Sequence, residues 1–364
     1  MYSEEDYWVW LCSVKGVGRR AFLCAVDKLG SAKNIFENPK EIKGLKGVTE
    51  KTADNIINSA TAEYMDGIFE KCEKLGIKTV SYNSNDYPYF LKNTAGMPLV
   101  LYYKGKMPSD WEKSVSVVGS RNPTRNGYKI IENLCENIAK NDIIVVSGMA
   151  SGCDSAAHGG ALRAGGITVA VLGCGADNVY PKENEMLYRQ ILEKGCVISE
   201  FIPGTKPIPA YFPRRNRIVA GISRCLIVGQ AAKKSGVNST VSYAEEYGKT
   251  IFAIPGEIDN PLSFVSNRLI KNGAEVLLGY EDFMETMGFE IVNNSQIQVE
   301  NKKVPLDFLH KHIYNLLLKG DLNIEQIAKQ TNKEINDINI ALTVMEMEGY
   351  IECLPGNIFS VRKI

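Results

Sequence analysis

The sequence lacks the features that mark membrane, secreted and metal-binding proteins. No stretch approaches the ~20 consecutive apolar residues of a membrane span. The nine cysteines are odd in number and include no CxxC pair, which is typical of reduced thiols and argues against a disulfide framework or a zinc site. Glu4, Glu5 and Asp6 stand where a signal peptide would be basic. We therefore expect a cytoplasmic protein with no membrane span and no metal site.

An excess of charge of one sign is also missing. The 364 residues carry 42 Lys+Arg and 42 Asp+Glu, which gives a net charge of zero with histidine neutral. This balance excludes a protein that is basic all over, but it allows a local basic groove. At roughly 150 residues per domain, the length predicts two or three domains.

The middle of the chain, 111–288, is predicted to be an α/β domain. Short runs rich in Val and Ile occur at 115–118, 143–146, 168–172, 225–228 and 250–254, with helical patterns between most of them. Continuous apolar strands that alternate with helices predict a Rossmann-like, doubly wound, mostly parallel sheet covered on both faces.

The N-terminal region, 1–80, alternates helical patterns with glycine turns. The turns at 14–21 and 45–53 are similar to those of helix-hairpin-helix motifs, in which the next helix presents free N–H groups to a phosphate. Plain helical hairpins are the alternative. The region has 12 basic and 12 acidic residues, which favours a degenerate or protein-facing module. Residues 81–110 are predicted to form an irregular bridge to the next domain.

The C-terminal region is predicted to be a winged helix, at 306–364, after a polar linker at 289–305. Two short helical patterns precede a longer one, and two strand-like pieces follow. The region has 6 basic and 8 acidic residues, and its candidate recognition helix carries Glu334, Asp337 and Glu346. Because a helix that reads duplex DNA normally exposes Lys and Arg, we favour a protein-interaction or regulatory module.

The chemistry of the α/β domain gathers in turns that follow its predicted strands. The turns at 119–124 (GSRNPT), 147–152 (SGMASG) and 173–177 (GCGAD) should share one edge of the sheet and offer backbone N–H groups to anionic oxygens. Arg121 adds a forked cationic donor. The segment 211–217 (YFPRRNR) adds three arginines and an aromatic ring, which suit an unpaired nucleic-acid strand. A solvated basic helix face is the plainer interpretation of that segment.

Known enzyme signatures are incomplete. Tyr243 replaces the first glycine of a possible P-loop that ends at Gly248-Lys249-Thr250, and the first turn fails the GxGxxG spacing. Asp154 and His158 lie four apart on a predicted helix, where a helix-stabilising role is commoner than acid–base catalysis. We expect no cofactor and no enzyme activity.

The motifs resemble those of the DNA-processing protein A (DprA/Smf) family. They are, in order, GSRNPTRNGY, VVSGMASGCDSAAHGGALRAGG, TVAVLGCGADNVYPKEN, SEFIPGTKPIPAYFPRRNRIVAGIS, IFAIPGEID and NRLIKNGA. The resemblance implies a sterile-alpha-motif-like or helix-hairpin-helix-like N-terminal domain and a C-terminal winged helix. It further implies a dimeric single-stranded DNA-binding protein, not an enzyme, which protects incoming DNA and helps load RecA in natural transformation.

Carried over by motif, the resemblance implies a DNA pocket in which backbone N–H groups and arginines contact phosphates and an aromatic ring contacts a base. Its members would be Gly119, Ser120, Arg121, Ser147, Gly148, Ala150, Lys182, Phe212, Arg215, Asn216 and Arg217, and the basic segment adds Arg214.

Three positions depart from the family's pattern. Gln230 stands where an acidic residue is usual, Asn238 lies in a turn that is usually apolar, and Val265 replaces a common glycine. We expect these departures to lie away from the DNA motifs, in the half of the domain that the resemblance links to self-association and RecA.

Two other functions stay open from the sequence. A nucleotide-binding sensor or phosphoribohydrolase-like enzyme is one, because 235–240 with Glu245 faintly resembles the PGGxGT…E turn of that superfamily, although the PGG is missing. A protein adaptor that uses the terminal modules is the other, but it leaves the glycine turns unexplained.

Overall fold

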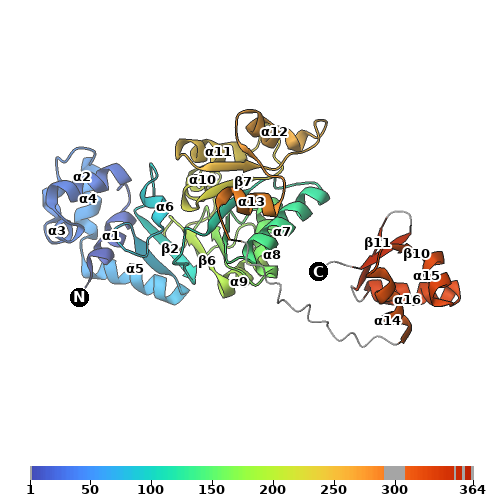
Figure 1. Cartoon of the computed structure of the whole chain (residues 1–364). Helices are drawn as coiled ribbons and strands as arrows, with labels where there is room; N and C mark the ends of the chain where they lie inside the picture. The colour runs from blue at the N-terminus through green and yellow to red at the C-terminus, as the bar shows by residue number, and fades with distance from the viewer. Residues whose placement is uncertain (1, 291–307, 348–349, 355–356, 362–364) are drawn as a thin grey trace. The chain divides into compact units, whose positions relative to one another are not determined.

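A computed structural model describes residues 2–290, 308–347, 350–354 and 357–361. The chain divides into two compact units at residues 291–292 (Figure 1). Most of the predicted linker at 289–305 lies outside the described residues. Among those residues, no helix combines the length and the apolar character needed to cross a membrane.

The first unit is built on a nine-stranded sheet with the order β1-β2-β6-β5-β4-β3-β7-β8-β9. Strands β3 to β9 run parallel, while β2 is antiparallel to β6 and to β1. The predicted mostly parallel sheet is therefore confirmed. The strands are β1 (Lys78–Ser81), β2 (Val100–Gly105), β3 (Ser114–Val118), β4 (Ile144–Ser147), β5 (Thr168–Val171), β6 (Cys196–Ser199), β7 (Cys225–Val228), β8 (Thr250–Ala253) and β9 (Glu275–Val276).

Helices cover both faces of the sheet, as the continuous apolar strands predict. On β4, Val145 packs into one hydrophobic core and Val146 into another, which shows the period of two. One face is covered by α7 (Arg125–Ala139), α8 (Cys153–Arg163), α9 (Glu185–Lys194) and α13 (Tyr280–Met287). The other is covered by α6 (Tyr89–Lys92), α10 (Tyr211–Ile222), α11 (Val237–Glu246) and α12 (Phe264–Lys271).

Residues 81–110 are more than the predicted irregular bridge. The apolar run after Pro98 forms β2, which hydrogen-bonds to β6 through pairs such as Tyr102 with Ser199. Strand β6 itself is only four residues long and was not among the predicted strands. The two strands pair with each other over a long stretch of chain, as Tyr102 does with Ser199, and local sequence does not reveal such a partner.

The N-terminal helices pack against the sheet and not only on one another. Trp8 and Trp10 share one hydrophobic core with Ala170 and Leu172. The two glycine turns also touch, because the Thr52 hydroxyl donates to the Gly16 carbonyl at 3.5 Å. The helices are α1 (Glu4–Ser13), α2 (Arg19–Leu29), α3 (Ala32–Glu37), η1 (Pro39–Ile42), α4 (Glu50–Ser59) and α5 (Ala62–Leu75).

The second unit has the element order of a winged helix, as predicted. Ile313, Ile338 and Leu342 are buried in its small core, and its three strands pair in the order β10-β12-β11. The elements are α14 (Phe308–Leu317), β10 (Leu322–Asn323), α15 (Ile324–Thr331), α16 (Ile335–Met347), β11 (Ile351–Leu354) and β12 (Ile358–Val361). Ile340 and Val344 on α16 are exposed, with no Lys or Arg on that helix.

Candidate nucleic-acid interface

A cavity of about 580 Å³ opens at the carboxyl ends of β3 and β7. Strand order reverses at this point, with β4 on one side of β3 and β7 on the other, and open α/β sheets bind ligands at such switch points. The structure brings seven of the predicted residues to this cavity: Gly119, Ser120, Arg121, Ala150, Phe212, Arg215 and Asn216. Gly148 lines a smaller crevice of about 70 Å³ beside Phe212 and Arg121.

The first turn is held rigidly, and it exposes Arg121. The amide of Ser120 donates to the Gln230 carbonyl at 2.6 Å, and its own carbonyl accepts from the Cys153 amide at 3.0 Å. Gly152 allows this approach, because a Cβ there would lie 2.4 Å from the Ser120 oxygen. The Arg121 side chain makes no ion pair with a described residue. A fixed backbone thus presents a cation that remains available to a ligand.

In the second turn, 147–152, a carboxylate of the protein itself already binds a backbone amide. The Ala150 amide donates to Asp154 Oδ2 at 3.2 Å, so the predicted free N–H group is already used. Burial raises the pKa of Asp154, which the nearby Arg215 charge opposes. The amide predicted to contact a phosphate therefore binds the Asp154 carboxylate.

Arg215 and Ser147 are buried and hold the site together, although Arg215 also lines both cavities, so a phosphate contact by either side chain stays a prediction. Arg215 is 5% exposed, and its guanidinium donates to the carbonyls of Gly148 and Val171. Burial lowers its pKa, which Asp154 opposes, yet a guanidinium stays charged in proteins. Ser147 is buried and donates to the Val117 carbonyl at 2.7 Å. Sequence alone places these residues at the turn but does not reveal that they point inward.

Phe212 packs beside the three glycine turns at 119–124, 147–152 and 173–177, which together we call the rim. Its ring packs on the third turn so closely that a Cβ on Gly173 would be 2.9 Å from it. Arg121 stands 6.0 Å from the ring centroid. The ring of Tyr180, a residue that was not predicted, lies 5.2 Å from that of Phe212, and Tyr180 is 41% exposed. The site therefore has two neighbouring aromatic rings beside an exposed cation.

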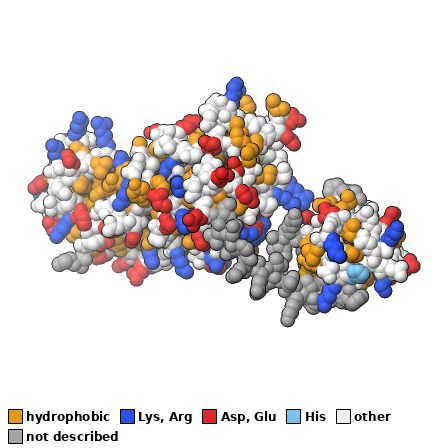
Figure 2. All heavy atoms as spheres, viewed as in Figure 1, with side chains coloured by type: hydrophobic (Ala, Val, Ile, Leu, Met, Phe, Trp, Pro, Cys, Tyr) orange, Lys and Arg blue, Asp and Glu red, His pale blue; other side chains and the backbone are white. Residues whose placement is uncertain are grey.

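Glu200 binds two of the three arginines on α10. Arg214 donates to Glu200 Oε2 from Nε at 3.0 Å and from Nη2 at 2.7 Å, and Arg217 donates to the same oxygen at 2.5 Å. The Glu200 side chain is only 3% exposed. These three residues carry a net charge of +1, so the basic segment is weaker than its sequence suggests. Figure 2 shows acidic and basic side chains interspersed over the visible face.

The remaining predicted residues have mixed positions. Asn216 donates to Ser239 Oγ at 2.8 Å and so joins α10 to α11. Lys182 is exposed in η2 (Lys182–Asn184) and does not line the cavity. Lys234, which was not predicted, does line it. This lysine could have been predicted, because it follows β7 and ligands bind beyond the carboxyl ends of the strands at a switch point.

The three departures from the family's pattern do not share the expected location. Gln230 belongs to the rim, because its side chain contacts Thr124 at the end of the first turn. Asn238 donates to the carbonyls of Lys233 and Ser235, close to the cavity. Only Val265 is away from it, fully buried on α12. The expectation that all three lie far from the DNA motifs is therefore wrong.

Comparisons with known proteins agree with the fold and the motifs. The family model for DNA recombination-mediator protein A matches residues 78–288, and that for the DprA winged helix domain matches 300–357. Protein Smf of Synechocystis sp. is 33% identical over 393 residues, which cover 97% of this chain and 98% of that protein. The DNA processing protein DprA of Streptococcus pneumoniae is 40% identical over 203 residues, covering 56% of this chain and 72% of that protein.

Solved structures show the same similarity. The crystal structure of DprA from Streptococcus pneumoniae covers 78% of this chain and 98% of its own, with 32% identity and a TM-score of 0.67. A DprA structure from Helicobacter pylori, described as showing a single-stranded DNA binding mode, covers 58% of this chain and 95% of its own, with 28% identity and a TM-score of 0.51. From its motifs, its fold and these relatives, the chain belongs to the DNA-processing protein A (DprA/Smf) family.

Proposed function

We propose that this protein binds single-stranded DNA in the cavity at the carboxyl ends of β3 and β7. Arg121 contacts a phosphate there, and the ring pair of Phe212 and Tyr180 stacks on bases. Arg215, Asp154 and Gln230 hold the turns in place. The binding described for the related protein from Helicobacter pylori supports this proposal.

The observation that carries the proposal is the position of Arg121. It is exposed, makes no ion pair with a described residue, and stands 6.0 Å from the centroid of Phe212. A cation beside an aromatic ring suits a strand with unpaired bases, since each nucleotide brings one phosphate and one π-face. Duplex DNA would hide its bases from these rings.

We further propose the cellular role that the family resemblance implies: the protein protects incoming DNA in the cytoplasm and helps load RecA during natural transformation. Self-association as a homodimer is part of this proposal. Val276 on the edge strand β9 and Leu278 just after it are exposed apolar side chains, and they support it.

Nuclease protection tests the central step. A labelled single strand is digested by a single-strand nuclease with the full-length protein or with its Arg121→Gln variant. The proposal expects protection by the wild-type protein that is largely lost in the variant. Equal protection by both would remove Arg121 from the interface, and protection by neither would contradict DNA shielding.

The alternative of a nucleotide-cleaving enzyme or nucleotide sensor is less well supported. All of residues 235–240 except Asn238 line the cavity, but the Val237 amide at the start of α11 donates to Ser235 Oγ at 3.2 Å. Glu245, the acidic residue of the resemblance, lines a different hollow with Lys249. The residues of that motif therefore do not meet at one place.

A further inference from the structure

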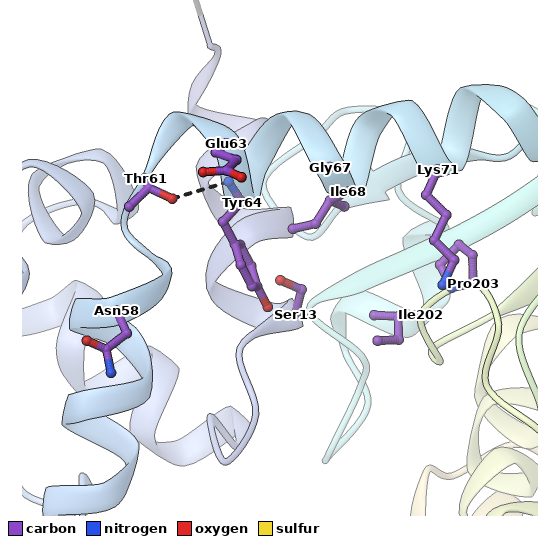
Figure 3. Close-up of a pocket in the computed structure, with 10 residues that line it drawn as sticks. All are labelled: Ser13, Asn58, Thr61, Glu63, Tyr64, Gly67, Ile68, Lys71, Ile202 and Pro203. Carbon is purple, nitrogen blue, oxygen red and sulfur yellow. Dashed lines mark hydrogen bonds between the residues drawn. The ribbon is translucent and has the colours of Figure 1, made fainter.

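A second cavity, of about 520 Å³, lies between the N-terminal helices and the loop after β6 (Figure 3). One wall is a face of α5 that carries Tyr64, Gly67 and Lys71 at helical spacing, and the other wall is Ile202 and Pro203. Tyr64 extends from α5 toward Ser13, while Lys71 reaches toward Pro203. We call this cavity the α5 groove.

The α5 groove is open and carries exposed side chains. Tyr64 is 38% exposed and Ile202 is 43% exposed. Gly67 lies in the middle of the helix, where glycine costs about 1 kcal/mol relative to alanine, yet a Cβ there would meet nothing within 4 Å. Packing does not explain this glycine, but the close approach of a ligand to α5 would.

One wall of the groove is joined by hydrogen bonds to the third glycine turn. The loop that contains Ile202 is hydrogen-bonded to the third glycine turn, because the Gly175 amide donates to the Thr205 carbonyl at 2.9 Å and the Gly204 amide donates to Asp177 Oδ1 at 2.8 Å. Since β6 is the neighbour of β5 in the sheet, its loop lies at the next position along the same edge. The exposed Lys206 and Pro209 then lead to Phe212.

The chemistry of the groove fits another part of the same ligand. Tyr64 offers an exposed aromatic ring for stacking, and Lys71 offers an ammonium that makes no ion pair with a described residue. Ser13, Asn58 and Thr61 add polar groups around the groove. Among the described residues, Glu63 is the one acidic side chain that lines it, so we expect stacking to contribute more than charge.

We propose that the α5 groove is a second subsite for single-stranded DNA, which receives the strand after it leaves the rim at Phe212. This inference rests on the proposed function, because the same strand must occupy the first cavity. It predicts a footprint that spans the N-terminal helices as well as the sheet. A short oligonucleotide fills the rim alone, and a longer one reaches Tyr64 and Lys71.

The test compares two oligonucleotide lengths on the full-length protein. Fluorescence anisotropy measures the Kd for labelled oligothymidylates of about 6 and about 20 nucleotides, lengths chosen around the usual 4–16 nucleotides of a single site. The variants are Tyr64→Ala, Lys71→Gln and Arg121→Gln. Tyr89→Ala is the matched control, since Tyr89 is also an exposed tyrosine but lies on α6, away from both cavities.

We expect Tyr64→Ala to raise the Kd of the longer oligonucleotide about fivefold or more and to leave the Kd of the shorter one unchanged. Lys71→Gln should reduce the slope of log K against log salt for the longer oligonucleotide by about 0.7. The subsite would be overturned if Tyr64→Ala weakened binding of both oligonucleotides equally, or of neither, while Arg121→Gln still weakened binding of both. If Arg121→Gln also has no effect on either length, the proposed function itself fails.

Discussion

The side-chain amide of Gln230 holds Thr124 at two points. Its Oε1 accepts from the Thr124 amide at 2.8 Å, and its Nε2 donates to Thr124 Oγ1 at 3.0 Å. The same hydroxyl oxygen caps α7 by accepting from the Gly127 amide at 3.0 Å. Gly127 makes room for the contact, because a Cβ there would lie 2.4 Å from Gln230 Oε1. Gln230 thus fixes the far end of the turn that carries Arg121.

Two substitutions separate the structural and electrostatic roles of Gln230. Gln230→Met removes both hydrogen bonds and should lower the free energy of unfolding by about 1–2 kcal/mol. Gln230→Glu keeps an acceptor for the Thr124 amide but adds a negative charge to the rim, so it should weaken single-stranded DNA binding most at low salt. Urea unfolding and anisotropy at two salt concentrations measure the two effects. A loss of affinity in Gln230→Glu that does not depend on salt would contradict the electrostatic role.

Arg121→Gln should affect DNA binding and leave stability almost unchanged. The side chain is exposed and unpaired among the described residues, and such surface substitutions usually change stability by less than about 0.5 kcal/mol. Loss of one phosphate contact should reduce the slope of log K against log salt by about 0.7. Anisotropy over a salt series checks this, and a slope equal to that of the wild-type protein would exclude a phosphate contact at Arg121.

Arg215→Met should behave in the opposite way. Removing this guanidinium takes away the hydrogen bonds to the carbonyls of Gly148 and Val171 and the nearby charge that favours the ionised form of Asp154. Each buried group left unpaired costs about 1–3 kcal/mol. The expected result is a large drop in the free energy of unfolding, measured by denaturant titration. Arg215→Met combined with Asp154→Asn should recover part of the loss, because the uncompensated charge is then gone. Strictly additive losses in the double variant would show that the two side chains are not coupled.

Glu200→Gln should release positive charge on α10, next to the cavity-lining residues Pro213 and Asn216. Glu200 accepts hydrogen bonds from Arg214 and Arg217, so its neutralisation raises the local charge from +1 to +2. Affinity for single-stranded DNA should rise at low salt and depend more steeply on salt. Arg217 is only 12% exposed, so most of the gain should come through Arg214 and disappear in Glu200→Gln combined with Arg214→Gln. A gain that persists in that double variant would contradict this account.

His158 should make the fold sensitive to acid. Burial, with a smaller contribution from Arg215, lowers its pKa to about 3, whereas the unfolded value is about 6.5. Between these values the unfolded chain binds more protons, so the free energy of unfolding falls as the pH drops below about 6.5, by at most about 1.4 kcal/mol per unit. Asp154 acts in the opposite direction, since burial raises its pKa.

The comparison with His158→Gln isolates the histidine, because both proteins keep Asp154. The imidazole hydrogen-bonds to Thr168 Oγ1 at 2.6 Å, and glutamine offers a replacement polar group. Urea unfolding at about pH 5 and about pH 7 should show a smaller loss on acidification in the variant than in the wild-type protein. Equal losses in both would show that His158 is not the group responsible.

The sequence predicts the fold well because its strongest signals are local. Val and Ile runs locate most of the parallel strands, and the glycine turns follow from strand ends that share one edge. Whether a side chain points into the core or into solvent is a tertiary property. Arg215 and Arg121 are the same residue type, but Arg215 is buried against carbonyl oxygens and Arg121 is exposed.

Partners that are distant along the chain explain the remaining errors. Glu200 precedes the arginines of α10 by 14 and 17 residues, and Gln230 follows Thr124 by 106. No spacing rule links such pairs. Tyr180 could have been suspected from the YPKEN motif, but only its distance from Phe212 shows that the two rings lie together.

The most direct test of the account is the salt dependence of single-stranded DNA binding. Fluorescence anisotropy with a labelled oligonucleotide measures the affinity over a series of salt concentrations, with unlabelled duplex of equal length as competitor. The account predicts binding that weakens with salt and that duplex competes for poorly, because phosphates meet Arg121 and unpaired bases meet Phe212 and Tyr180. No binding at modest salt, or equal competition by duplex, would contradict it.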